Sequence, residues 1–583
     1  MIVFRLISLI ILVFMMSLKC ADPQKNISMS SSNKVSIENK MFLDSAVPLK
    51  IVSVSPSDEI SVENIMSLES AGPLKNFSSS TSRENSVDEK ISLESAVPQK
   101  NGSVWPSNES LEKNTSHLQI LYKKPNNSSP FWIEIAALHQ IPGSRMKSSS
   151  YIRASEYQEG IAEPFPTLID ALVDSGAGGT RVYLEWGQIE NEPLQYSWNW
   201  YDARLSQIGE LGLQIIVNID EPPKWALPTT SSSCPPIIPD RLDEFARFLK
   251  ALVNRYKVPP FNVKQWELFN EPDNITSRNW QGCRGYYGEN YSKMLSVAYP
   301  AIKSADPDAV VLLGGIAYDW FTEDSYMPGE CVGCNFGPFY RLFLDEVVQA
   351  GGAPFFDALN FHYFPSFAPE WERWVPGNLP TCDYPEGLSG NTYQAGGIDL
   401  IAKASHYRNR MATCHGVNKP VWVTELGEHG YPGNSASLAQ QARYVIKGNV
   451  RGMAAGVEKI VWYALTTPND EDEQQLLYDD WSPKPGFYAF KTLTSELRGN
   501  EYDRTLNISN VEGYVFANNS GSEKVVAWGS GSLTFTPASQ LRVVDRDGNV
   551  TIIQDGGSGD LDGAQNGRIQ FQTTKEPFFI KIF

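Results

Sequence analysis

The stretch GGTRVYLEW, residues 178–186, is a short run of apolar and β-branched residues that predicts a buried β-strand. A helical pattern follows it at 200–211, and a second apolar run, LQIIVNID, follows at 213–220. A long amphipathic pattern at 240–255 then predicts another helix. Strand and helix therefore alternate, which is typical of βα units built around a parallel sheet.

The same alternation continues along the chain. Five further predicted strands are VKQWELFNE (263–271), AVVLLGGIA (309–317), FFDALNFHYF (355–364), PVWVTELGE (420–428) and VEKIVWYAL (457–465). A fainter run at 131–138 supplies an eighth strand, and eight such units predict a (β/α)₈ TIM barrel. A doubly wound open sheet is the alternative, but no glycine-rich phosphate turn follows any of the runs, which disfavours it.

After residue 497 the helical period stops, and short alternating segments such as GYVFAN (513–518) and KVVAWG (524–529) predict a small antiparallel β-domain. Its acidic loop DGGSGDLDG (555–563) lacks the ligand order of a calcium loop, so a polar turn is the preferred interpretation. The predicted fold class is thus α/β, with a barrel over 129–496 and a C-terminal β-domain over 497–583.

The first 128 residues differ in composition. Residues 1–20 carry Arg5 and an apolar run over 6–16, which predicts a signal peptide. A lipoprotein signal ending at Cys20 is disfavoured because Lys19 precedes that cysteine, and no other stretch reaches the roughly 18 apolar residues of a membrane span.

Residues 21–128 are rich in Ser, Asn, Glu and Lys, and they repeat a related unit every 25 residues: ADPQKN at 21, AVPLKI at 46, AGPLKN at 71 and AVPQKN at 96. A solenoid also has such periods, but these units offer few apolar residues to stack. We therefore expect a disordered, low-complexity stalk.

Cysteine usage also indicates an extracellular protein. Six cysteines remain after the predicted cleavage, at positions 234, 283, 331, 334, 382 and 414, and an even number in an oxidising compartment favours disulfides. The CxxC of Cys331 and Cys334 lacks a second ligand pair, so zinc is the weaker interpretation. Several Asn-x-Ser/Thr sites, such as Asn274 and Asn290, would accept glycans in a eukaryotic host.

Charge and aromatic content limit the possible partners. Lys and Arg total 49 against 67 Asp and Glu, a net charge of −18, so binding to nucleic acid is disfavoured. The chain also has 15 Trp, 25 Tyr and 27 Phe, enough aromatic rings for both a core and a binding cleft.

Two glutamates end predicted strands: Glu271 ends the fourth and Glu425 the seventh. Because the strands of a barrel end at one face, both carboxylates should lie in the same mouth. Two carboxyl groups about 5 Å apart are what a retaining glycosidase requires. A single strand-end glutamate is more commonly solvated or salt-bridged, so the pair counts for more than either residue alone.

These strand ends resemble those of the clan A glycoside hydrolases, in which strand four ends in Asn-Glu-Pro and strand seven in a second Glu. Other matching features stand in the clan's order: Arg181, EWGQIENEP (185–193) with YSWNWYD (196–202), PPKW (222–225), His362-Tyr363 and Trp462. The resemblance covers about residues 176–465. The tryptophan-rich loop and the trailing β-domain are most similar to family thirty-nine, with the family-five cellulase type next.

The resemblance implies that Glu271 is the acid/base and Glu425 the nucleophile. It also implies that Asn270 binds the sugar 2-hydroxyl and that Arg181 orients the nucleophile and keeps it ionised. A turn-capping amide and an interior ion pair are the structural alternatives for these two side chains.

Other substrate-binding candidates line the predicted mouth. His362 is expected to face the barrel axis, and Trp462 to form the floor of the subsite at the cleavage point. Trp186 and Trp225 are candidate further walls. Core packing is the ordinary alternative for His362 and Trp462, and packing between loops is the alternative for Trp186 and Trp225.

The sequence therefore predicts a secreted or cell-surface-associated retaining glycosidase that hydrolyses β-linked oligo- or polysaccharides without a cofactor or metal. Metal-assisted hydrolysis is disfavoured by only six His and no HExxH motif. The alternatives are a catalytically inactive carbohydrate-binding barrel, against which the presence of both carboxylates argues, and a surface adhesin, which would not need tryptophan-rich strand ends.

Overall fold

The computed structural model describes residues 129–136, 138–141, 165–227, 237–273, 287–317, 343–365, 397–467 and 473–583. The predicted signal peptide and stalk lie outside these ranges, as do all the cysteines except Cys414, which is disulfide-bonded. Within the described ranges, no helix is both long enough and apolar enough to cross a membrane.

Eight parallel strands form the larger sheet, in the spatial order β5-β4-β3-β2-β1-β8-β7-β6. They are β1 (Phe131–Ile135), β2 (Gly179–Glu185), β3 (Gln214–Asp220), β4 (Gln265–Asn270), β5 (Val310–Gly315), β6 (Leu359–Tyr363), β7 (Val421–Leu426) and β8 (Lys459–Thr466). Two parallel bridges, Leu312 to Ala358 and Ile316 to Phe361, join the two ends of this order. The sheet therefore closes into a barrel, and the predicted fold class is confirmed.

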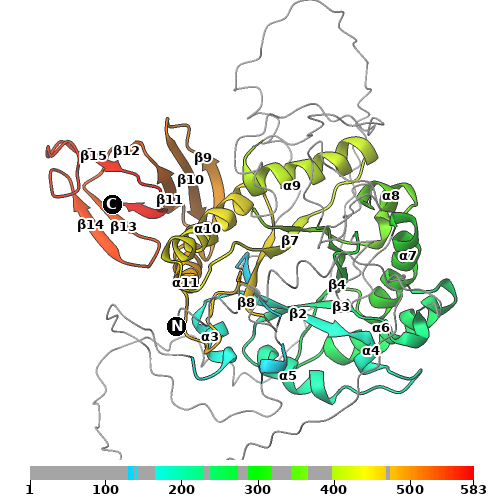
Figure 1. The fold of residues 1–583 in the computed structure, drawn as a ribbon. Helices are drawn as coiled ribbons and strands as arrows, with labels where there is room; N and C mark the ends of the chain where they lie inside the picture. Colours follow the sequence, from blue (N-terminus) through cyan, green and yellow to red (C-terminus); the bar gives the residue numbers. More distant parts are fainter. Residues whose placement is uncertain are drawn as a thin grey trace, which may run out of the picture. The chain divides into compact units, whose positions relative to one another are not determined.

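Helices alternate with these strands along the chain and lie around them in Figure 1. They are α3 (Leu168–Asp174), α4 (Trp186–Ile189), α5 (Asn199–Gly209), α6 (Leu242–Tyr256), α7 (Gly288–Ala305), α8 (Phe343–Gln349), α9 (Asp399–Asn409), α10 (Ser435–Ala454) and α11 (Pro485–Leu497). In α6 the buried Phe245, Phe248, Leu249 and Leu252 follow the helical period and cover the barrel. The helix starts slightly later than predicted because a 3₁₀ turn, Pro239–Arg241, precedes it.

The barrel interior has an apolar layer below a polar one. The apolar layer is a separate cluster of buried side chains: Trp132, Ile216, Leu312, Ala358, Trp422 and Val461. Side chains two positions apart on a strand share a face. Glu134, Asn360 and Thr424, each two positions after one of these apolar residues, therefore belong to the polar layer, and all three are fully buried.

The C-terminal β-domain contains a six-stranded antiparallel sheet, in the order β14-β13-β16-β11-β10-β9, and a two-stranded ribbon of β12 and β15. Its strands are β9 (Asn500–Thr505), β10 (Val511–Asn518), β11 (Glu523–Gly529), β12 (Ser532–Phe535), β13 (Gln540–Val544), β14 (Val550–Gln554), β15 (Ile569–Gln572) and β16 (Phe578–Ile582). The sequence did not reveal β9, which is polar and mostly exposed, or β12, which has only four residues.

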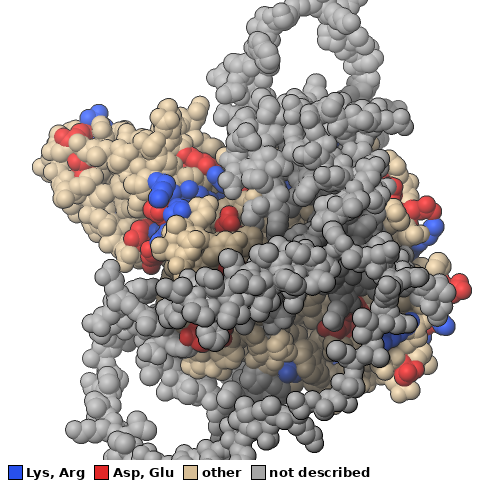
Figure 2. Space-filling model, in the orientation of Figure 1, with Lys and Arg blue, Asp and Glu red and all other residues tan. Residues whose placement is uncertain are grey.

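One face of this sheet shares a hydrophobic core with the barrel, since Tyr514 and Trp528 belong to the same buried cluster as the barrel helices. Arg451 of α10 adds a two-point ion pair with Glu512 of β10, at 2.7 and 2.8 Å. Figure 2 shows basic side chains beside acidic ones on the described surface. The β-domain is thus attached by both apolar and charged contacts.

The acidic loop of the β-domain uses its carboxylates to build turns. Asp555 accepts hydrogen bonds from the backbone N–H of Asn566 and Gly567. Asp562 accepts from the guanidinium of Arg568 at 2.8 Å. The loop therefore has the contacts of a polar turn.

Candidate active site

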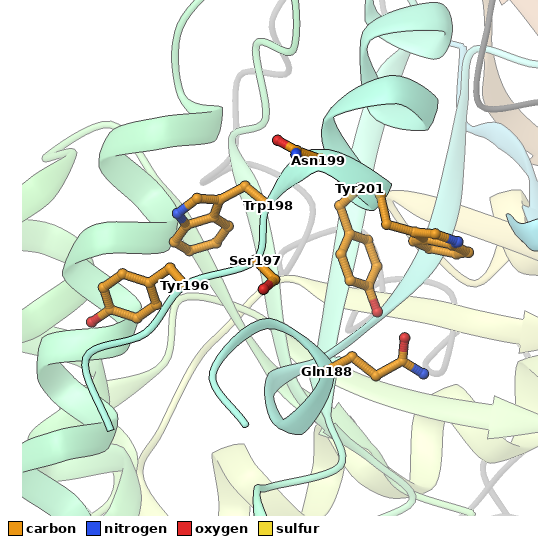
Figure 3. Close-up of a pocket in the computed structure, with 7 residues that line it drawn as sticks. Gln188, Tyr196, Ser197, Trp198, Asn199 and Tyr201 are labelled. Atoms are coloured by element: carbon orange, nitrogen blue, oxygen red, sulfur yellow. The ribbon is translucent and has the colours of Figure 1, made fainter. Parts of the chain in front are cut away.

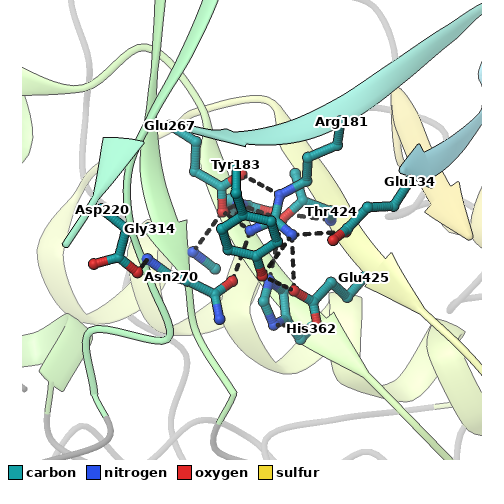
Figure 4. A network of polar contacts seen from close by, with 12 residues as sticks. Glu134, Arg181, Tyr183, Asp220, Glu267, Asn270, Gly314, His362, Thr424 and Glu425 are labelled. Carbon is teal, nitrogen blue, oxygen red and sulfur yellow. Dashed lines mark hydrogen bonds and ion pairs between the residues drawn. The ribbon is translucent and has the colours of Figure 1, made fainter. Parts of the chain in front are cut away.

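A polar network lies inside the barrel, with Arg181 of β2 at its centre (Figure 4). Arg181 Nη1 donates to Glu134 Oε2 at 2.7 Å and to Glu425 Oε1 at 2.8 Å. Its Nε and Nη2 donate to the two oxygens of Glu267 at 2.6 and 3.0 Å. One buried guanidinium thus faces three carboxylates, contributed by β1, β4 and β7.

Glu425, the predicted nucleophile, is only 5% exposed. Its Oε1 accepts hydrogen bonds from Arg181 and, at 3.0 Å, from the hydroxyl of Tyr183. Its Oε2 lies 3.2 Å from His362 Nδ1. Two donors therefore fix one oxygen of Glu425, while the other faces the imidazole.

An irregularity in β7 turns Glu425 into the interior. Phe361 of β6 pairs with Val423, but the next residue, His362, pairs with Glu425, so Thr424 is an extra residue on β7. The Thr424 hydroxyl lies 3.2 Å from His362 Nε2, so it too faces the interior. A β-bulge of this kind allows two consecutive side chains to point to one side of a sheet.

Glu271, the predicted acid/base, directly follows β4 in a left-handed backbone conformation, with φ 45°. Such a conformation is unfavourable for residues other than glycine and is concentrated at functional sites. Glu271 Oε1 lies 3.1 Å from His362 Nδ1. One carboxylate oxygen of Glu271 and one of Glu425 lie within 4.8 Å of each other. The structure therefore brings the two predicted catalytic glutamates together.

His362 of β6 lies between the two carboxylates, with its Nδ1 3.1 Å from Glu271 Oε1 and 3.2 Å from Glu425 Oε2. Gly315 on β5 makes room for the ring, because a Cβ at this position would lie 2.0 Å from His362 Nε2. Burial lowers the pKa of His362 to about 4, although the charge of Glu425 opposes this effect. Near neutral pH the ring is therefore an uncharged hydrogen-bonding group.

Opposing effects act on the ionisation of the network. Burial raises the pKa of Glu425, whereas the charges of protonated His362 and of Arg181 lower it. For Arg181, burial alone would lower the pKa, but Glu267 and the other acidic neighbours hold it well above its usual value. Because the His362 ring is uncharged near neutral pH, Arg181 is the cation that favours the ionised form of Glu425.

Asn270 ends β4 and is 3% exposed. Its Oδ1 accepts a hydrogen bond from Arg181 Nη2 at 2.7 Å, and its backbone N–H donates to Asp220 at 3.3 Å. The contact with Arg181 occupies the acceptor of the amide, so its nitrogen is the group that can donate to a hydroxyl. This orientation is compatible with the role expected for Asn270.

The expectation for Trp462 is not met. Its ring is fully buried and lies 6.4 Å from that of Tyr444 on α10, between the barrel and its helices. Val461 belongs to the interior cluster, so strand alternation directs Trp462 outward and Tyr463 inward. The ring of Tyr463, edge-on to that of Phe364 at 6.0 Å, is the better placed aromatic group on β8.

Trp186 is likewise not a cleft wall, because it is fully buried and stacks on Phe248 of α6 at 5.3 Å. Its Nε1 donates to Glu190. Trp225 is partly buried, lies edge-on to Trp186 at 5.4 Å and donates to the backbone of Glu190. Both rings hold loops in place, which was their structural alternative.

A surface cavity of about 410 Å³ lies in the loop after β2 (Figure 3). It is lined by Gln188, Tyr196, Ser197, Trp198, Asn199, Trp200 and Tyr201. The guanidinium of Arg204 lies 4.0 Å from the ring centre of Trp200, and Trp198 stacks on Phe248. Because these contacts already occupy faces of the two indoles, we assign no sugar to this cavity.

Among the network residues that sequence reasoning missed are Glu134, Glu267 and Tyr183, which contact Arg181 directly. A signal was present for Tyr183, which stands two positions after Arg181 on β2. Even spacing on a strand places side chains on the same face. Glu267 had none, because Glu271 lies beyond the end of β4 in a left-handed conformation. Glu134 carried no such signal, because the pattern of its strand was faint.

A (β/α)₈ barrel with acidic side chains at the ends of its fourth and seventh strands is the arrangement expected of a barrel glycoside hydrolase. Residues 148–335 of the chain match the family "Cellulase (glycosyl hydrolase family 5)". This segment includes Arg181 and Glu271 but ends before Glu425. No curated protein gives a significant match to the sequence.

Solved structures share the fold. A family 39 glycoside hydrolase from the gut symbiont Bacteroides cellulosilyticus WH2 is 18% identical, with a TM-score of 0.52 over 78% of this chain and 81% of that one. The catalytic domain of GH30 xylanase C from Talaromyces cellulolyticus is 14% identical, with a TM-score of 0.50 over 78% and 97%. The matches confirm the predicted resemblance to the clan A glycoside hydrolases, and the predicted class of enzyme, a glycosidase, agrees with them.

The Tyr183 hydroxyl gives a test of how the network controls Glu425. Tyr183→Phe removes a donor to the ionised carboxylate, so the pKa of Glu425 should rise. Activity that needs the anion is lost as the pH falls through this pKa, and the acidic limb of kcat/KM should therefore move up by about one pH unit. Tyr502→Phe, in the β-domain, is the matched control and should leave the limb in place. An unmoved limb in Tyr183→Phe would contradict the assignment.

Proposed function

We propose that this protein is a retaining glycosidase that hydrolyses β-linked oligo- or polysaccharides. The observation that carries this proposal is the separation of less than 4.8 Å between one oxygen of Glu271 and one of Glu425. Retaining enzymes hold their two carboxyl groups about 5 to 5.5 Å apart, whereas inverting enzymes leave about 6.5 to 9.5 Å for a water molecule. The close pair supports retention.

In the first step, Oε2 of Glu425 attacks the anomeric carbon. The bond from that carbon to the leaving oxygen breaks, and Glu271 gives this oxygen its proton. In the second step, Glu271 takes a proton from a water molecule, whose oxygen attacks the same carbon and releases Glu425. We assign the attack to Oε2 because Arg181 and Tyr183 hold Oε1.

The surrounding groups support these steps. Arg181 and Tyr183 stabilise the carboxylate that attacks and later leaves. Asn270 is the candidate donor to the hydroxyl next to the reacting carbon, where hydrogen bonds strengthen in the transition state. His362 contacts both glutamates and fixes their relative positions.

Release of the protein from the cell, or its display on the cell surface, belongs to the same proposal. The apolar run at 6–16 supports a signal peptide, and the disulfide of Cys414 fits an oxidising compartment. The remaining predicted disulfides and the glycans are part of this proposal as well.

Product stereochemistry tests the function directly. We expect the full chain to hydrolyse at least one of a panel of β-linked xylo-, gluco-, manno- and galacto-oligosaccharides. Proton NMR recorded before mutarotation should show the β-anomer as the first product. An α-anomer would contradict the retaining mechanism, and no hydrolysis in the whole panel would favour the carbohydrate-binding or adhesin alternatives.

The same assay addresses a second use of the site. One imidazole and two carboxylates are also donors that a divalent cation can use, and Glu271, His362 and Glu425 form such a group. We expect dialysis against a chelator to leave the rate unchanged, because the proposed mechanism uses only protons and a carboxylate. Loss of activity that is restored by added metal would replace the proposed mechanism with metal-assisted hydrolysis.

A further inference from the structure

The charges around Arg181 do not balance if every acid is ionised. Glu134, Glu267 and Glu425 all contact this single guanidinium, and none is more than 5% exposed. Three anions and one cation would leave two uncompensated negative charges in the barrel interior. Buried like charges are costly, and a group in such a cluster takes up a proton instead.

The three acids differ in the number of hydrogen-bond donors that surround them, and Glu267 has the most. Glu267 Oε2 accepts a hydrogen bond from Arg181 Nε. Its Oε1 accepts hydrogen bonds from Arg181 Nη2, Gly315 N and Asn360 Nδ2, and the Thr424 hydroxyl lies 3.2 Å from the same oxygen. Both oxygens of Glu267 therefore have hydrogen-bond partners.

Glu134 is at the other extreme. Its Oε2 receives one donor, Arg181 Nη1, and its Oε1 is buried with no hydrogen-bond partner among the described residues. Glu425 is intermediate, with the Arg181 and Tyr183 donors on Oε1. An anion at Glu134 would therefore be the least compensated of the three.

We propose that Glu134 is a positioning residue and that it is the protonated acid among the three around Arg181. The positive charge of Arg181 then compensates only the carboxylates of Glu267 and Glu425. As a neutral acid, Glu134 carries the proton on Oε1, and its carbonyl oxygen Oε2 accepts a hydrogen bond from Arg181 Nη1. Neutral Glu134 thus holds the guanidinium of Arg181 in contact with Glu425, and it adds no negative charge that Arg181 must also compensate.

Other features of the cluster agree. Burial raises the pKa of Glu134 well above that of an exposed glutamate, against the opposing charge of Arg181, and Glu425 and Glu267 raise it further. The charged and titratable groups facing Glu134 are Arg181 on β2, Glu267 on β4 and Glu425 on β7. An ionised Glu134 would share Nη1 with Glu425 and favour protonation of the nucleophile. The inference thus rests on the proposed role of Glu425.

Infrared difference spectroscopy and a pH profile of Glu134→Gln test the proposal. Glutamine has the shape and charge of the neutral acid, so kcat/KM should stay within about threefold. The acidic limb should move by less than about 0.3 pH unit. At pH 7 the wild-type spectrum should contain a carbonyl band of a protonated carboxylic acid that is missing in Glu134→Gln. The control Glu289→Gln, which changes an exposed glutamate of α7, should keep this band.

Two results would overturn the proposal. One is a spectrum in which Glu134→Gln removes no protonated-acid band, or a wild-type spectrum without any such band. The other is an acidic limb that falls by about one pH unit in Glu134→Gln, since that shift shows the removal of a negative charge beside Glu425. The spectra need no turnover, so this inference and the proposed glycosidase activity can fail separately.

Discussion

Glu425→Ala is expected to lower kcat on natural substrates by roughly 10⁴- to 10⁶-fold, because the proposed mechanism forms its covalent intermediate on this carboxylate. The variant should fold, since it removes a carboxylate from a cluster with excess negative charge. Added azide should enter the vacated space and attack the anomeric carbon directly. The product should be a glycosyl azide of inverted configuration, detected by NMR.

The control for this experiment is Glu289→Ala, which removes an exposed glutamate from α7 and should retain full activity. A glycosyl azide of retained configuration from Glu425→Ala would reverse the two assigned roles. Wild-type activity in this variant would place the catalytic pair elsewhere.

Glu271→Ala is expected to have an effect that depends on the leaving group. On natural substrates kcat should fall by roughly 10²- to 10⁴-fold, because proton transfer to the leaving oxygen is lost. An activated aryl glycoside needs little protonation, so the variant should still form the glycosyl-enzyme and then accumulate it. Azide should release the sugar as a glycosyl azide of retained configuration. Equal losses on both kinds of substrate would argue against an acid/base role for Glu271.

Much of the barrel could be predicted from the sequence because its strands are buried on both faces and therefore form continuous apolar runs. The two glutamates could be located because each ends such a run. In the β-domain, β9 gave no signal because a polar, exposed strand lacks hydrophobic alternation. Residue pattern thus predicts elements that bury apolar surface better than those that do not.

The details of the site were harder to predict, because they depend on which face of a strand each side chain occupies. Trp462 was favoured for its residue type, yet strand alternation directs it to α10. Glu134 is held by Arg181, a partner 47 positions away in the chain, and nothing local marks that contact. Contacts between strands are set by the register of the closed barrel, which the sequence of one strand does not contain.

The extra residue in β7, Thr424, makes the orientation of Glu425 depend on the number of residues in this strand. With Thr424 in place, the strand can present both a hydroxyl and a carboxylate to the interior, whereas a strictly alternating strand would direct one of the two into the helix layer. A point substitution at position 425 changes the type of side chain there, but the side chain still points into the barrel interior. Insertion or deletion of a single codon at this strand would therefore change whether the side chain at position 425 faces the barrel interior or the helix layer.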